Sequence, residues 1–69
     1  MKLKQLADLE GKSIDELLES CITDSVNPGI CTNEWCDYTT EVEPDQRAGW
    51  CEECQENTVK SALVLADIF

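Results

Sequence analysis

The clearest apolar periodicity in the chain covers residues 14–22, where apolar side chains recur at helical spacing. They occupy positions i, i+3, i+4, i+7 and i+8 and form one stripe, made of Ile14, Leu17, Leu18, Cys21 and Ile22. Ser13 and Glu16 stand at the two ends of a capping-box pattern, in which the serine is the N-cap. The pattern predicts an amphipathic helix that begins directly after Ser13.

A shorter apolar pattern over residues 3–10 predicts another helix before this one. Gly11 follows it at the position where a helix commonly ends with glycine. Asn27-Pro28-Gly29 cannot continue the second helix, because proline lacks an amide donor and restricts the residue before it. We therefore expect a helical arm at residues 1–25 and a second module at residues 26–69.

The middle of the chain alternates between polar and apolar positions, as a half-buried strand does. Tyr38, Thr40 and Val42 share one face of residues 38–42, and Pro44-Asp45-Gln46 is typical of a turn. Residues 47–50 are expected to return as the second strand, so the pattern predicts a β-hairpin.

The last apolar segment fits two structures. Asn57 or Thr58 is suited to cap a helix whose apolar face holds Val59, Ala62, Leu63 and Ala66. A strand over residues 62–65 remains an alternative, because a short apolar run does not separate the two.

Cysteine spacing adds a chemical constraint to this outline. The chain has five cysteines and no histidine, and four of the cysteines form the pairs Cys31-x4-Cys36 and Cys51-x2-Cys54. Tetrahedral Zn²⁺ takes four such sulfur ligands at about 2.3 Å, and a closed shell of this kind is structural rather than catalytic. We predict a small α+β metal-stabilised domain with one Zn²⁺ in a zinc-ribbon-like hairpin. Iron is the competing metal, because tetrahedral S₄ sites accept either ion.

Other uses of these cysteines fit less well. A redox pair at Cys51 and Cys54 is disfavoured because Glu52 and Glu53 between them should raise the thiol pKa values. Cys21 belongs to the apolar stripe, where a thiol packs as a small hydrophobe. With no histidine base, no glycine-rich phosphate loop and no calcium-loop pattern, we expect no enzyme.

Charge and hydropathy limit the partners and the location. The net charge is -10, and such a surface repels nucleic-acid phosphates and anionic lipids. The longest apolar run, residues 62–66, is far shorter than the roughly 20 residues of a membrane-spanning helix. The first five residues lack the apolar core of a secretory signal, so we expect a cytoplasmic protein.

The two tryptophans are expected to have different roles. Trp50 directly precedes Cys51 and is expected to pack over the metal turn. Trp35 lies inside the first cysteine turn, where an exposed indole flanked by Glu34 and Asp37 would form a partner-binding face. The alternative is that Trp35 lies flat on its own hairpin.

Several strings carry a resemblance to a known group. They are Gly29-Ile30-Cys31, Cys36-x-Tyr38, Glu41-Val42-Glu43-Pro44-Asp45-Gln46, Gly49-Trp50-Cys51-x2-Cys54 and Asn57-Thr58-Val59. Through them the chain resembles small uncharacterised zinc-ribbon-like proteins of bacteria and bacteriophages. The resemblance implies the four-cysteine metal site and a prokaryotic or viral origin, but no activity. Asp37 and Gln55 depart from it, because zinc ribbons often have glycine after the second cysteine of each turn.

These observations favour a non-enzymatic, zinc-stabilised module that binds another protein. Such a module would be a phage or bacterial adaptor, or a modulator of a host complex. A nucleic-acid-binding zinc ribbon and a rubredoxin-like electron carrier are the two alternatives.

Overall fold

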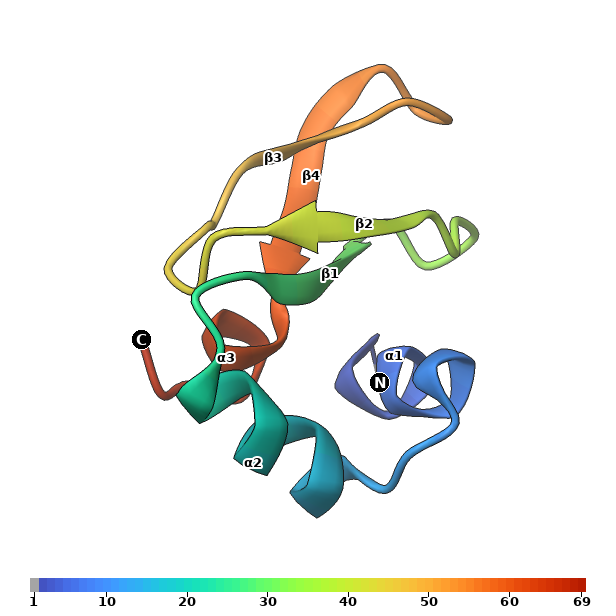
Figure 1. Cartoon of the computed structure of the whole chain (residues 1–69). Coiled ribbons are helices and arrows are strands. Elements are labelled where there is room, and N and C mark those ends of the chain that lie inside the picture. Colours follow the sequence, from blue (N-terminus) through green and yellow to red (C-terminus); the bar gives the residue numbers. More distant parts are fainter. Residues whose placement is uncertain (1) are drawn as a thin grey trace.

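The computed structural model describes residues 2–69 and has helices at one end and a curled antiparallel sheet at the other (Figure 1). Its elements are α1 (Lys2–Glu10), α2 (Ile14–Thr23), β1 (Asn27–Cys31), β2 (Thr39–Val42), β3 (Gly49–Cys51), β4 (Glu56–Ser61) and α3 (Ala62–Leu65). The predicted α+β class is confirmed. Within this range no helix is long and apolar enough to cross a membrane.

Helix α1 ends, and helix α2 begins, at the residues that the sequence predicts. Gly11 follows α1 with a φ of 71°, a left-handed conformation that glycine adopts without steric cost. At the start of α2 the Ser13 hydroxyl accepts a hydrogen bond from the Glu16 amide at 3.2 Å. The same hydroxyl donates to the Glu16 carboxylate at 3.2 Å, so serine and glutamate fix each other at the helix start.

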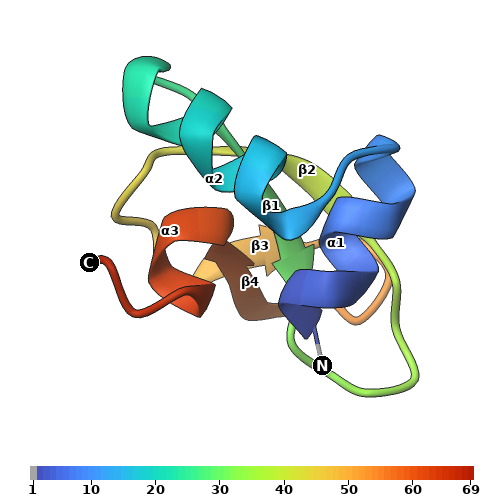
Figure 2. The ribbon, with the colours of Figure 1, turned by 90° about the horizontal axis from the view of Figure 1, so that it is seen from below.

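The helices share one apolar core with the sheet. Its buried members are Leu3, Leu6, Ala7, Leu17, Cys21, Ile30, Ala62 and Leu63. Seen from the helical end, all three helices lie in front of the strands (Figure 2). Ile22, the last residue of the apolar stripe predicted for residues 14–22, is 67% exposed. The face of α2 that packs on the core is therefore narrower than the stripe.

The strand order is β2-β1-β4-β3, and the predicted hairpin between residues 38–42 and 47–50 is wrong. β2 pairs with β1, whereas β3 pairs with β4, so the two expected partners are the opposite edges of the sheet. The central positions belong to the strands that contain the fully buried Ile30 and Val59. Apolar burial therefore decides the order, and the connection over residues 43–48 crosses from one edge to the other.

The C-terminal segment is strand first and helix second. Residues 62–65 form α3, so the expected C-terminal helix is confirmed and the alternative of a strand there is wrong. The helix begins later than expected, because Asn57 and Thr58 lie in β4 and do not cap it. Ser61 marks the change: its hydroxyl accepts from the Val64 amide at 3.2 Å as the N-cap of α3. That hydroxyl also donates to the carbonyl of Pro44, which ties the crossing connection to the end of β4.

Ser61→Ala should lower the free energy of unfolding by about 1–3 kcal/mol, because it removes a helix cap and leaves the Pro44 carbonyl without its donor. Urea unfolding of the full chain measures this difference. Ser25→Ala is the matched control, since Ser25 is exposed, and it should change stability by less than about 0.5 kcal/mol. Equal losses in the two variants would contradict the role of Ser61.

Candidate metal centre

Strand β4 brings the two cysteine pairs together, in place of the hairpin that the sequence predicts. Cys31 ends β1 and stands opposite Val59 of β4, and Cys51 ends β3 and stands opposite Glu56 of the same strand. Each cysteine leads into a tight turn that returns a second sulfur, that of Cys36 or Cys54. Two turns from distant parts of the chain therefore face each other at one end of the sheet.

The four sulfur atoms form a compact cluster with the dimensions of a tetrahedral metal site. The cysteine cluster consists of Cys31, Cys36, Cys51 and Cys54, whose Sγ atoms all lie within 4.8 Å of one another. The Cys31–Cys54 and Cys36–Cys51 Sγ distances are both 3.7 Å. A regular tetrahedron with metal–sulfur bonds of about 2.3 Å has edges of about 3.8 Å. A disulfide needs about 2.05 Å, so these thiols are free and can hold a metal ion.

Side-chain and backbone groups form hydrogen bonds with the sulfur atoms of the cluster. The Asn33 side-chain amide donates to Cys54 Sγ at 3.4 Å, and the Cys54 backbone amide donates to Cys51 Sγ at 3.4 Å. The Thr58 hydroxyl lies 3.0 Å from Cys31 Sγ. Such donors stabilise thiolates and fix the orientation of metal ligands. Sequence reasoning missed Asn33 and Thr58, and Thr58 reaches the cluster only through the pairing of β1 with β4.

The surroundings of the cluster shift the thiol pKa values of Cys31 and Cys54 in opposite directions. Burial raises the pKa of Cys31, but hydrogen bonds from Thr58 and the Asn33 backbone outweigh it and lower the pKa to about 7. The Asn33 side chain lowers the pKa of Cys54, whereas burial and the neighbouring sulfurs raise it to about 12. Four adjacent sulfurs therefore cannot all ionise unless a cation neutralises them. Thiolate ligands select zinc or iron over magnesium and calcium.

The second cysteine turn has an unusual backbone conformation. Gln55, directly after Cys54, has a φ of 56°, and its amide donates to the Cys51 carbonyl at 2.7 Å. Across residues 2–69 the positive φ values outside glycine belong to Gln55 and Asp67. Of the two residues that replace the glycine common in zinc ribbons, Gln55 therefore adopts a left-handed backbone conformation and Asp37 does not.

Gln55→Gly should raise the free energy of unfolding by about 1 kcal/mol, because a left-handed conformation is costly for every residue with a β-carbon. Asp37→Gly, the equivalent change in the first turn, should give no gain, since Asp37 lacks a positive φ. Urea unfolding of the metal-loaded proteins measures both. A similar gain in the two variants would mean that Gln55 stores no strain.

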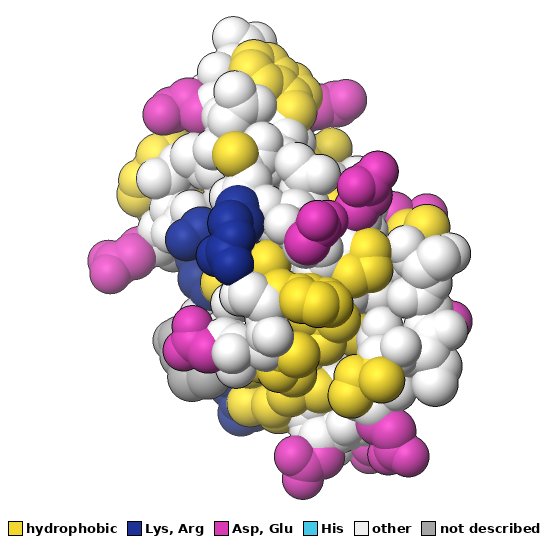
Figure 3. Space-filling view, turned by 90° about the vertical axis from the view of Figure 1, so that its left-hand side faces the viewer, with side chains coloured by type: hydrophobic (Ala, Val, Ile, Leu, Met, Phe, Trp, Pro, Cys, Tyr) yellow, Lys and Arg dark blue, Asp and Glu magenta, His cyan; other side chains and the backbone are white. Residues whose placement is uncertain are grey.

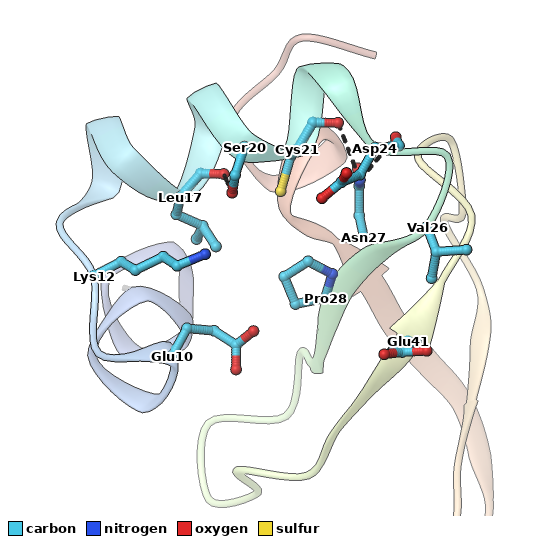
Figure 4. A pocket seen from close by; sticks show the side chains of 10 residues that line it. All are labelled: Glu10, Lys12, Leu17, Ser20, Cys21, Asp24, Val26, Asn27, Pro28 and Glu41. Atoms are coloured by element: carbon cyan, nitrogen blue, oxygen red, sulfur yellow. Dashed lines mark hydrogen bonds between the residues drawn. The ribbon is translucent and has the colours of Figure 1, made fainter.

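Cys21 lies apart from the cluster. It is a buried member of the helical core, as predicted, and lines a separate cavity of about 190 Å³ where α2 meets β1 (Figure 4). Burial raises the pKa of the Cys21 thiol; Lys12 lowers it, and Asp24 and Glu10 raise it further. A neutral thiol packed among apolar side chains has no part in the cysteine cluster.

The predicted partner-binding residues are all exposed around the first cysteine turn. Trp35 is 77% exposed, which excludes an indole lying flat on the protein, and Glu34 and Asp37 are exposed beside it. The Lys2 ammonium donates to the Cys36 carbonyl and so ties α1 to this turn. Trp50 is 52% exposed, so it covers the metal turn less completely than the sequence suggests.

No protein-family model matches the chain, and neither a curated protein nor a solved structure is significantly similar to it. The resemblance to zinc-ribbon-like proteins of bacteria and bacteriophages therefore stays a prediction. The cysteine cluster itself is a finding of the structure.

Replacing any cysteine of the cluster by serine should abolish metal binding and unfold the sheet, because structural zinc supplies much of the folding free energy of small domains. Cys21→Ser should keep the metal and cost about 1–3 kcal/mol by burying an unpaired hydroxyl. Metal analysis of each variant measures whether the ion is retained, and circular dichroism measures whether the chain is folded. Loss of metal from the Cys21 variant would show that the ligand set is a different one.

Proposed function

We propose that the chain is a non-enzymatic module that is stabilised by one Zn²⁺ and binds another protein. The observation that carries this proposal is the exposure of the Trp35 side chain, which is 77%. Trp35 directly precedes Cys36, one of the four cysteines of the cluster. Large exposed indoles are enriched among the residues that dominate protein interfaces. A metal-held turn presents such a side chain in one conformation, which lowers the ordering cost of binding.

A structural role for the metal follows from the ligand set. Four cysteine ligands complete a tetrahedral shell, so the ion keeps no open position for water or substrate. Zinc binding contributes about 10–16 kcal/mol in zinc-finger peptides, which is ample for a chain with few buried apolar residues. A rubredoxin-like iron site is the alternative, because the sulfur spacing suits both ions, and ferric thiolate would colour the purified protein.

The charge around Trp35 favours a basic partner. Glu34 and Asp37 are exposed beside the indole, and the whole chain has a net charge of -10. Complementary charge speeds the encounter with a cationic protein surface and disfavours nucleic acid, whose phosphates need basic side chains. On this proposal the cellular role is that of a cytoplasmic adaptor, or of a modulator of a host complex, in a bacterium or bacteriophage.

Affinity capture with the metal-loaded chain tests this function. Trp35→Ala should retain the metal and the thermal transition but lose the captured partner. Ile22→Ala is the matched control, since Ile22 is an apolar side chain that is 67% exposed on α2, and it should capture as the unchanged chain does. Full capture by the Trp35 variant would remove the indole from the interface.

A further inference from the structure

The two edge strands of the sheet border one groove. β2 and β3 lie at opposite ends of the strand order, yet residues of both line the same hollow of about 430 Å³. The sheet is therefore curled far enough to turn its edges toward each other. In Figure 1, β3 lies above β2, and β4 crosses the view between them.

The side chains of this groove suit a cationic group. Tyr38 and Trp50 supply aromatic rings, and the indole of Trp50 is 52% exposed. Glu41, Glu43 and Glu52 supply carboxylates, and the lining contains neither lysine nor arginine. A cation over an aromatic face gains electrostatic attraction, and carboxylates beside it add charge-assisted hydrogen bonds.

The backbone of the groove suits an extended chain. Within the described part of the protein, β2 pairs with β1 alone and β3 with β4 alone, so each strand has one edge without a ladder. Such edges add a further strand when an extended peptide offers its own amides and carbonyls. Alternate side chains of that peptide then point toward the same face.

We propose that this groove binds an arginine side chain from an extended, basic segment of a partner protein. Arginine fits better than lysine, because its planar guanidinium stacks on an indole and forms paired hydrogen bonds with a carboxylate. Trp35 is not among the lining residues, so this is a second surface that does not depend on the face assigned to Trp35.

The test must separate a specific groove from general attraction. Acidic side chains are spread over the face drawn in Figure 3, which also carries a group of basic side chains, and the net charge of -10 attracts any basic peptide. Glu43 and Glu52 are exposed and line the groove, whereas Asp15 and Glu19 are exposed on α2. Glu43→Gln/Glu52→Gln and Asp15→Asn/Glu19→Gln therefore remove equal charge from the groove and from a remote helix.

The probe is the synthetic peptide acetyl-(Arg-Thr)4-amide, titrated into the metal-loaded full chain carrying Trp35→Phe. This background leaves Trp50 as the one tryptophan, so its fluorescence reports the groove directly. We expect a saturable change in emission. The groove pair should weaken binding about tenfold or more, and the remote pair by less than about twofold. Replacing the arginines of the peptide by lysines should also weaken it.

Equal weakening by the two charge-matched pairs would overturn the proposal, because it would reduce the binding to general attraction. A flat fluorescence titration would overturn it as well. Both pairs replace exposed side chains, and an unchanged thermal transition verifies that each variant is folded. Since Trp35 is already absent from the probe protein, neither result depends on the outcome of the Trp35 capture experiment.

Discussion

Four sulfur atoms within 4.8 Å of one another can hold a metal ion, and in our proposal the sheet end of this protein depends on that ion. The buried apolar residues there are three of these cysteines and Val59, with Tyr38, Val42 and Cys54 partly buried against them. Without a metal, this half would have almost no core to offset the entropy of ordering its turns. The cluster thus replaces a hydrophobic core, and the two free sheet edges and the exposed indoles are positioned around it.

The sheet divides the molecule into two differently stabilised halves. Neighbouring residues of β1 face opposite sides, so Ile30 packs into the helical core while Cys31 belongs to the cysteine cluster. The halves remain connected through Lys2, which donates to the Cys36 carbonyl, and through Ser61, which joins β4, α3 and the crossing connection. Replacing one of the four cysteine ligands should therefore unfold the sheet before it unfolds the helices.

Local sequence signals predicted the local parts of this structure well. Ser13, Glu16 and Gly11 act through neighbours in the chain, so the two N-terminal helices were correct, and the grouping of the four cysteines was also recognisable from spacing. Strand pairing depends on contacts between distant residues, and the expected hairpin failed because burial of Ile30 and Val59 gives β1 and β4 the central positions. The pairing of β1 with β4 also brings Thr58 next to Cys31, a contact that no sequence motif predicts.

Native mass spectrometry of chain purified without added metal tests the central claim most directly. The account predicts one Zn²⁺ per chain in a compact charge-state distribution, and a shift to the high charge states of an unfolded chain once a chelator removes the ion. A metal-free chain with the compact distribution would contradict it, because the cysteine cluster would then fold without the cation on which the account depends.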